Sequence, residues 1–174
     1  LMNPPLQIVT SNRFIVSIAI LVSLLALNAC SSDAPLGPDD VQFPSTDGTL
    51  LRGHHYGSSD ITVVLAHMSR SDQQIWREFA GTLNKAGYAA FSFNFRGFKP
   101  SKGDKEIPLI DRDLEGALEY LESQGVKKIF IVGASMGGTA AIKVAAHRDI
   151  IGGIVTISAP LEINGLAAKE DVKL

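Results

Sequence analysis

The stretch Gly133-Ala134-Ser135-Met136-Gly137-Gly138 decides the fold of this chain. It follows the apolar run 129–132 and precedes an alanine-rich stretch, so a strand should enter a tight turn from which a helix leaves. A serine in such a turn stands clear of the backbone with a positive φ. Glycines two residues before and after it avoid clashes with the strand and the helix. This pattern predicts a nucleophile elbow, with Ser135 as the nucleophile and Gly133 and Gly137 making the turn possible.

Two other uses of a glycine-rich turn before a helix are excluded by single residues. A dinucleotide-binding fingerprint needs glycine where Ser135 stands, and a phosphate-binding P-loop needs lysine where Thr139 stands. A plain strand-to-helix turn with a solvent-facing serine remains the alternative.

The composition fits one globular domain. The chain has 174 residues, a formal net charge of −2 and 45% hydrophobic residues, enough for a real core. No basic stripe is present, so we expect no nucleic-acid partner. No spacing of cysteine and histidine suggests zinc, and we expect no metal or other cofactor.

The N-terminus predicts export. Arg13 is the only charged side chain before Asp33, and residues 14–29 are almost wholly apolar. That run is shorter than the roughly 20 residues that span a bilayer, so residues 1–29 are typical of a secretory signal peptide. Residues 30–40 form a tether rich in small residues, and 41–174 form the domain.

The only cysteine, Cys30, directly follows Leu27-Asn28-Ala29. This end of the apolar run resembles the lipobox of bacterial lipoproteins, which implies that Cys30 is acylated and that the bilayer is a partner. The absence of aspartate directly after Cys30 implies the outer membrane in a double-membraned bacterium. An ordinary signal peptide with a stray cysteine, or an uncleaved anchor helix, are the alternatives.

From Val41 onward, strands should alternate with helices. Residues 41–43 and 50–56 predict an edge hairpin whose adjacent His54 and His55 point to opposite faces. Residues 61–66, 88–93, 129–132 and 154–157 predict further strands, with 61–66 and 154–157 buried on both faces.

Helix signals separate these strands. One helix should start at a capping box of Ser71 and Gln74 and end at Gly87. Its apolar face consists of Trp76, Phe79, Ala80 and Leu83. A second helix should be capped by Asp111 and closed by Gly125, with Leu114, Ala117, Leu118 and Leu121 inward, and another should begin at Gly165. The fold class is therefore α/β, a mostly parallel sheet with helices on both faces. Ser135, His67 and Asn94 follow the carboxyl ends of strands, where such sheets bind ligands.

The segments 64–67, 93–97 and 133–138 together resemble the α/β-hydrolase family, over about residues 41–160. The resemblance implies an oxyanion hole made by the backbone N–H of Met136 and that of Met68. Met68 stands where the family commonly has glycine, and Asn94 where it often has aspartate; we expect the second change to be structural only. His67 is expected to shape its loop and not to act as the base, because the family order is serine, acid, histidine.

The only histidine after Ser135 is His147, about three helical turns along and some 15 Å away. The resemblance therefore places the acid and histidine beyond Leu174. We expect this chain to be the N-terminal part of a longer hydrolase, without its last strands and inactive alone. The function expected is an envelope-anchored hydrolase of a small-molecule acyl substrate, an ester, thioester or lactone. Peptidase, lipase and dienelactone-type activities stay open, and the alternative is a non-catalytic lipoprotein that uses the fold for binding.

Overall fold

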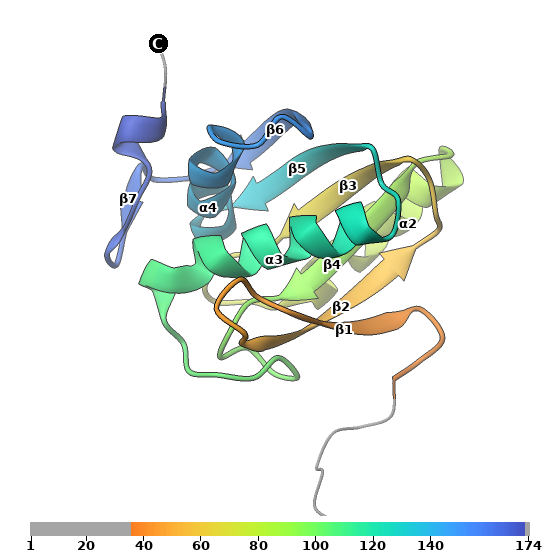
Figure 1. The fold of residues 1–174 in the computed structure, drawn as a ribbon, viewed down its shortest axis with the longest axis horizontal. Coiled ribbons are helices and arrows are strands. Elements are labelled where there is room, and N and C mark those ends of the chain that lie inside the picture. The colour runs from red at the N-terminus through yellow and green to blue at the C-terminus, as the bar shows by residue number, and fades with distance from the viewer. Residues whose placement is uncertain (1–35, 173–174) are drawn as a thin grey trace, which may run out of the picture. The chain divides into compact units, whose positions relative to one another are not determined.

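The computed structural model describes residues 36–172. The predicted signal peptide, Cys30 and most of the tether lie outside the described residues. Six strands form one sheet in the order β1-β2-β4-β3-β5-β6 (Figure 1). Their bounds are β1 Asp40–Pro44, β2 Leu50–Tyr56, β3 Ile61–Ala66, β4 Ala89–Asn94, β5 Lys128–Ala134 and β6 Ile151–Ile157.

The sheet combines an antiparallel edge with a parallel centre. β1 pairs with β2 and β2 with β4 in antiparallel fashion, whereas β4, β3, β5 and β6 run parallel to one another. The predicted hairpin is therefore confirmed. His54 and His55 do point to opposite faces: His54 Nδ1 lies 2.7 Å from an Asp40 carboxylate oxygen, and His55 Nε2 lies 3.0 Å from the Tyr120 hydroxyl.

Helices cover both faces of the sheet, which confirms the predicted fold class. α2 (Arg77–Lys85) packs on β4 and β2, while α3 (Ile110–Ser123) and α4 (Met136–Ala145) pack on each other and on β1, β5 and β6. In Figure 1, α3 lies in front of the sheet and α2 behind it. Both α2 and α3 end just before the predicted glycines, Gly87 and Gly125.

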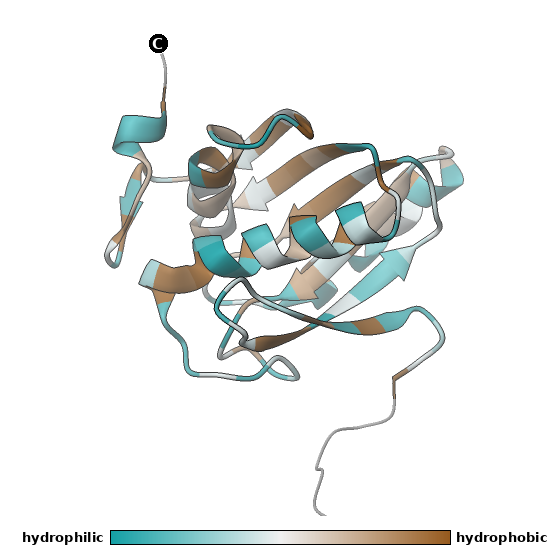
Figure 2. Cartoon of the chain, in the orientation of Figure 1, coloured by the Kyte–Doolittle hydropathy of each residue, from teal (hydrophilic) through white to brown (hydrophobic). Residues whose placement is uncertain are grey.

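Each face has its own apolar core. The larger one joins the predicted inward face of α3 to β4, β5 and α4, and the smaller one joins Trp76 and Ala80 to Leu65, Ala90 and Ala134. Figure 2 shows the parallel strands mostly in the hydrophobic colour, while α3 carries both colours, as an amphipathic helix does. Leu114, Ala117, Leu118 and Leu121 are all buried, as predicted.

Both predicted helix caps are wrong. At the first, the Asp72 carboxylate accepts the Gln74 N–H at 2.8 Å and starts a 3-10 turn, η1 (Gln73–Trp76), so Ser71 does not cap. At the second, the 3-10 turn η2 (Ile107–Leu109) leads directly into α3. Asp111 therefore lies inside the first helical turn, where its carboxylate pairs with Lys143 of α4 at 2.7 Å.

Two predictions about apolar burial also fail. Phe79, placed by helical periodicity on the inner face of α2, is 42% exposed, with its ring 6.1 Å from that of Trp76. β6 begins at Ile151 and is not buried on both faces, because Val155 and Ile157 are 58% and 49% exposed. β6 is one of the two edge strands of the described sheet, and α2 packs on β4 and β2, away from β6.

The last described segment is a small hairpin and not the helix predicted from Gly165. β7 (Glu162–Ile163) pairs with β8 (Leu166–Ala167), and a short 3-10 turn, η3 (Lys169–Asp171), follows. Asn164 and Gly165 both have positive φ, 46° and 88°. This is the geometry that an Asn-Gly pair favours between two strands, a local signal that the helix prediction overlooked. No helix within residues 36–172 is long and apolar enough to cross a membrane.

Candidate active site

Ser135 lies between the end of β5 and the start of α4, with φ 46° and ψ −114°. The positive φ agrees with the expectation for an elbow. Two backbone hydrogen bonds hold this conformation. The Ser135 N–H donates to Ile157 O of β6 at 2.8 Å, and Ser135 O accepts the N–H of Thr139 at 3.0 Å. The strained residue is therefore fixed between a neighbouring strand and the helix that follows it.

The glycines around Ser135 are required by close backbone approach. A Cβ at Gly133 would lie 2.6 Å from Gly137 O, and one at Gly137 would lie 2.4 Å from Ala66 O at the end of β3. A Cβ at Gly138, to which the sequence analysis gave no role, would lie 2.6 Å from the Ala159 Cβ. The three glycines let the elbow sit directly against β5, the β3 loop and the segment after β6.

The two expected oxyanion donors are the backbone N–H groups of Met136, on α4, and of Met68, in the loop after β3. Met136 is the first residue of α4 and is fully buried, and its N–H has no carbonyl acceptor within the helix. Met68 is 37% exposed in the loop after β3, whose Ala66 and His67 carbonyls face Gly137. The structure thus brings the Met68 loop beside the first turn of α4.

His67 connects the β3 loop to the β4 loop. Its buried ring donates from Nδ1 to Met68 O at 2.8 Å and accepts the Phe95 N–H at Nε2 at 3.2 Å. The ring also packs edge-on against Phe95 and Phe98, with centroids 5.0 and 4.7 Å away. Burial lowers the pKa of His67 to about 4, so the imidazole is neutral at pH 7. With both ring nitrogens engaged, His67 shapes its loop, as predicted, and cannot act as a base.

Asn94 likewise holds loops together. Its side-chain oxygen accepts the Gln73 N–H at 2.7 Å, and its amide nitrogen donates to Lys99 O at 2.7 Å. Its backbone oxygen accepts the Ser101 hydroxyl at 2.6 Å. These contacts agree with the expectation that asparagine at this position has a structural role.

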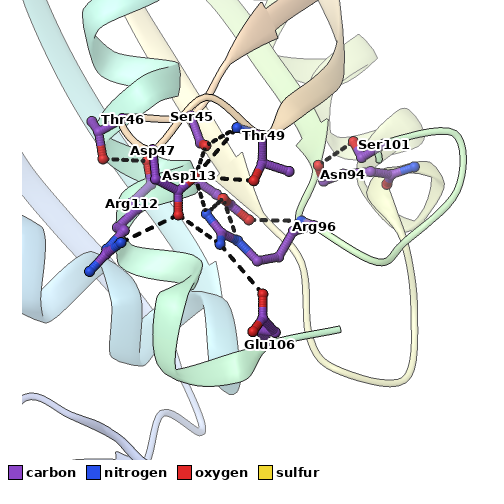
Figure 3. Close-up of polar contacts among 10 residues, drawn as sticks. All are labelled: Ser45, Thr46, Asp47, Thr49, Asn94, Arg96, Ser101, Glu106, Arg112 and Asp113. Atoms are coloured by element: carbon purple, nitrogen blue, oxygen red, sulfur yellow. Dashed lines mark hydrogen bonds and ion pairs between the residues drawn. The ribbon is translucent and has the colours of Figure 1, made fainter. Parts of the chain in front are cut away.

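A buried ion-pair network below these loops was missed by the sequence analysis. Arg96 is only 2% exposed, and the Asp113 carboxylate of α3 is fully buried. Three groups of Arg96 donate hydrogen bonds to this carboxylate: the backbone N–H at 2.7 Å, Nε at 2.8 Å and a terminal nitrogen at 2.6 Å (Figure 3). The guanidinium also contacts Asp47 of the β1–β2 turn at 2.9 Å. The network fastens the β4 loop to α3 and to the hairpin.

The electrostatics of the two carboxylates differ because their burial differs. The hydrogen bonds from Arg96 and Ser45 hold the pKa of Asp47 well below its usual range. Burial raises the pKa of Asp113, and the hydrogen bonds from Arg96 oppose that rise. For Arg96 itself, burial alone would lower the pKa, but the bonds to Asp113 and Asp47 outweigh it and keep the guanidinium charged.

None of the four histidines of the chain can reach Ser135 as a base. His147 lies beyond the end of α4, more than about 15 Å along the helix from Ser135, and its Nε2 pairs with Asp171 at 2.9 Å. His54 and His55 are held on β2, and His67 is neutral with both nitrogens engaged. Within residues 36–172 no cluster of three or more metal-ligating side chains is present.

A cavity of about 810 Å³ lies away from this site. Its walls include His55, Asp60, Thr62, Tyr120 and Val126, at the end where β3 begins and α3 finishes. Ser135 lies at the opposite end of the parallel strands. We take the elbow and not this cavity as the candidate active site, because parallel sheets bind ligands at the carboxyl ends of their strands.

Comparison with known proteins gives consistent results. Residues 56–172 match the alpha/beta hydrolase fold family. The uncharacterized protein YfhR of Escherichia coli strain K12 is 26% identical in an alignment over 155 residues, which covers 78% of this chain and 54% of that protein. The thermostable monoacylglycerol lipase of Bacillus sp. strain H-257 is 31% identical over 111 residues, 62% of this chain and 44% of the lipase. The chain thus spans about half the length of the curated relatives that it matches.

Solved structures show the same fold. The Pyrococcus furiosus esterase Pf2001 superimposes with a TM-score of 0.63 at 28% identity, over 70% of this chain and 50% of the esterase. A serine hydrolase homologue from Coxiella burnetii gives a TM-score of 0.61 at 18% identity, over 77% of this chain and 69% of that one, a likeness of fold alone.

Proposed function

The chain belongs to the alpha/beta hydrolase fold family, and from this premise we propose that it supplies the nucleophile, Ser135, of a serine hydrolase acting on carboxylic-ester-type bonds. The observation that carries the proposal is the backbone of Ser135: a non-glycine residue at φ 46°, held between β5 and α4 by glycines that no other residue could replace without a clash. Similarity to an esterase and to a monoacylglycerol lipase supports the ester class.

In the proposed reaction the Ser135 oxygen attacks the carbonyl carbon while a base takes the hydroxyl proton. The negative charge that develops on the carbonyl oxygen is stabilised by the N–H groups of Met136 and Met68. Collapse of the tetrahedral intermediate expels the alcohol, which takes up the proton, and leaves an acyl group on Ser135. Water then repeats the attack and releases the acid. The reaction requires no cofactor.

The base in this scheme comes from outside this sequence. Each of the four histidines in the 174 residues has a hydrogen-bond partner elsewhere, and none lies where it could accept the Ser135 proton. The proposal therefore assigns the catalytic acid and histidine to further residues of the protein, and residues 1–174 alone are expected to hydrolyse esters at a negligible rate.

A fluorophosphonate probe tests the nucleophile. The whole gene product should become labelled at Ser135, and labelling should be abolished in Ser135→Ala and by prior heat denaturation. Ser69→Ala, a nearby loop serine whose side chain has no part in the scheme, serves as the matched control and should label normally. Labelling that survives Ser135→Ala would refute the assignment.

The alternative function is that of a non-catalytic envelope protein. The observation that favours it is that none of the four histidines lies where it could act as a base for Ser135. The nucleotide sequence after the codon for Leu174 separates the two. An open frame with an aspartate after a strand and a later histidine supports the enzyme, whereas a genuine stop codon at that point supports the binding protein.

The proposal also includes lipid anchoring through Cys30 in the bacterial envelope, supported by the apolar run 14–29 that ends at this only cysteine. Acyl chains supply membrane affinity of about 0.8 kcal/mol per buried CH₂. Radiolabelled palmitate should be incorporated into the wild-type protein and not into Cys30→Ala. Incorporation that persists in this variant would rule out the anchor.

A further inference from the structure

The loop that carries the proposed oxyanion donor Met68 is bound by a lysine from another part of the chain. Lys105 Nζ donates to Ser69 O at 2.7 Å, across a separation of 36 residues. Ser69 directly follows Met68 in the loop after β3. A hydrogen bond from an ammonium group is charge-assisted and stronger than one between neutral groups. Lys105 therefore holds the backbone one residue away from the donor.

The Lys105 ammonium also contacts an aromatic ring that supports the same loop. It lies 4.0 Å from the centroid of the Phe98 ring, a cation–π contact. The same ring packs edge-on to His67, with centroids 4.7 Å apart. His67 in turn donates to Met68 O at 2.8 Å. Phe98 thus packs against both of the side chains that bind consecutive carbonyls of the loop.

The backbone of Lys105 is held in place by its own loop. A Cβ at Gly97, whose φ is 73°, would lie 2.4 Å from Lys105 N, so the two ends of this loop are in close contact. The next residue, Glu106, reaches the Arg96 guanidinium at 3.9 Å, and Arg96 is bound to the buried Asp113 of α3 (Figure 3). The lysine side chain therefore extends from a backbone that the buried ion-pair network ties to α3.

The two halves of the Met68 loop are held in different ways. Ala66 O and His67 O face Gly137, where a Cβ would approach them to 2.4 and 2.8 Å, so the elbow itself sets the first half. The residues after His67 are held by contacts that include those of the His67 and Lys105 side chains. An oxyanion donor has to lie within hydrogen-bond distance of the developing charge, and a displacement of about 1 Å can cost about 100-fold in rate. The position of Met68 is therefore sensitive to the contact that Lys105 makes.

We propose that Lys105 is a positioning residue of the oxyanion hole: by binding Ser69 O, it holds the Met68 N–H where it can donate to the charged oxygen of the transition state. The inference rests on the proposed function and adds to it a residue from outside the elbow and the β3 loop. The charge on this oxygen develops only in the transition state. Loss of the Lys105 contact should therefore lower kcat and leave KM nearly unchanged.

The test measures kcat and KM of three variants of the whole gene product with p-nitrophenyl butyrate. Lys105→Met keeps an unbranched side chain next to Phe98 and removes the donor and the charge. Its kcat should fall about five-fold, the factor that one net hydrogen bond supplies. Lys105→Arg can donate to the same carbonyl and should recover kcat to within about two-fold of the wild type. Lys99→Met removes the same charge from an earlier position in the same loop and should leave both constants unchanged.

Four results would overturn the inference. They are a wild-type kcat in Lys105→Met, a rise in its KM in place of the fall in kcat, a failure of Lys105→Arg to recover kcat, and an equal loss in Lys99→Met. Circular dichroism should show the same folded fraction in every variant, and a fall in kcat that parallels a loss of folded protein would also count against the positioning role. In each of these cases hydrolysis still depends on Ser135 and the proposed function stands. If Ser135→Ala does not abolish hydrolysis, the proposed function fails and the inference fails with it.

Discussion

Replacing Gly137 by alanine should separate the elbow from the β3 loop. The new Cβ would lie 2.4 Å from Ala66 O and 2.8 Å from His67 O, both backbone atoms that cannot rotate away. Reaching even 3.0 Å from Ala66 O requires the two backbones to part by about 0.6 Å (3.0 − 2.4). Such overpacking costs about 1–3 kcal/mol, of which the better helix propensity of alanine offsets up to about 1.

Gly81→Ala is the matched control. Gly81 lies inside α2, where an added Cβ would meet nothing within 4 Å, so alanine should stabilise the fold by about 0.5–1 kcal/mol. Urea unfolding followed by circular dichroism should give Gly137→Ala a free energy of unfolding about 1–2 kcal/mol below that of the wild type. The free energy of unfolding of Gly81→Ala should be higher than that of the wild type. The fluorophosphonate labelling rate should fall only in Gly137→Ala. Equal unfolding midpoints for the two variants would refute the close-approach argument.

The remaining predictions concern the buried polar groups. The folded pKa of His67, about 4, lies below the unfolded value of 6.5, so the unfolded state binds the proton more readily. The contribution of His67 to the free energy of unfolding should be complete above pH 6.5 and should fall by about 3 kcal/mol as the pH drops toward 4. Urea titrations at a series of pH values should show this fall in the wild type and not in His67→Gln. Asp113→Ala should destabilise the protein by about 3–5 kcal/mol, because it leaves the Arg96 charge buried without its main partner. Asp60→Ala, at an exposed ion pair, should have little effect on the urea midpoint, and comparable losses for the two variants would contradict the role of burial.

The sequence alone determined the parts of this protein that depend on local spacing. Continuous apolar runs identified the parallel strands, and the edge hairpin followed from the turn signal between residues 41–43 and 50–56. The glycines around Ser135 identified the elbow, because a tight strand-to-helix turn leaves no room for side chains at those positions. The class α/β was therefore predictable before any tertiary contact was known.

Only the tertiary structure decided which polar groups meet. Arg96 finds Asp113 at a separation of 17 residues and Asp47 at 49, and no local pattern encodes pairs so far apart. The failed cap at Asp111 has the same origin, since its carboxylate is engaged by Lys143 of another helix. Lys105 could not be singled out from the sequence either, because its contact with Ser69 O joins residues 36 positions apart. Spacing along the chain determined where the turn at Ser135 lies, and the packing of distant segments decided what surrounds it.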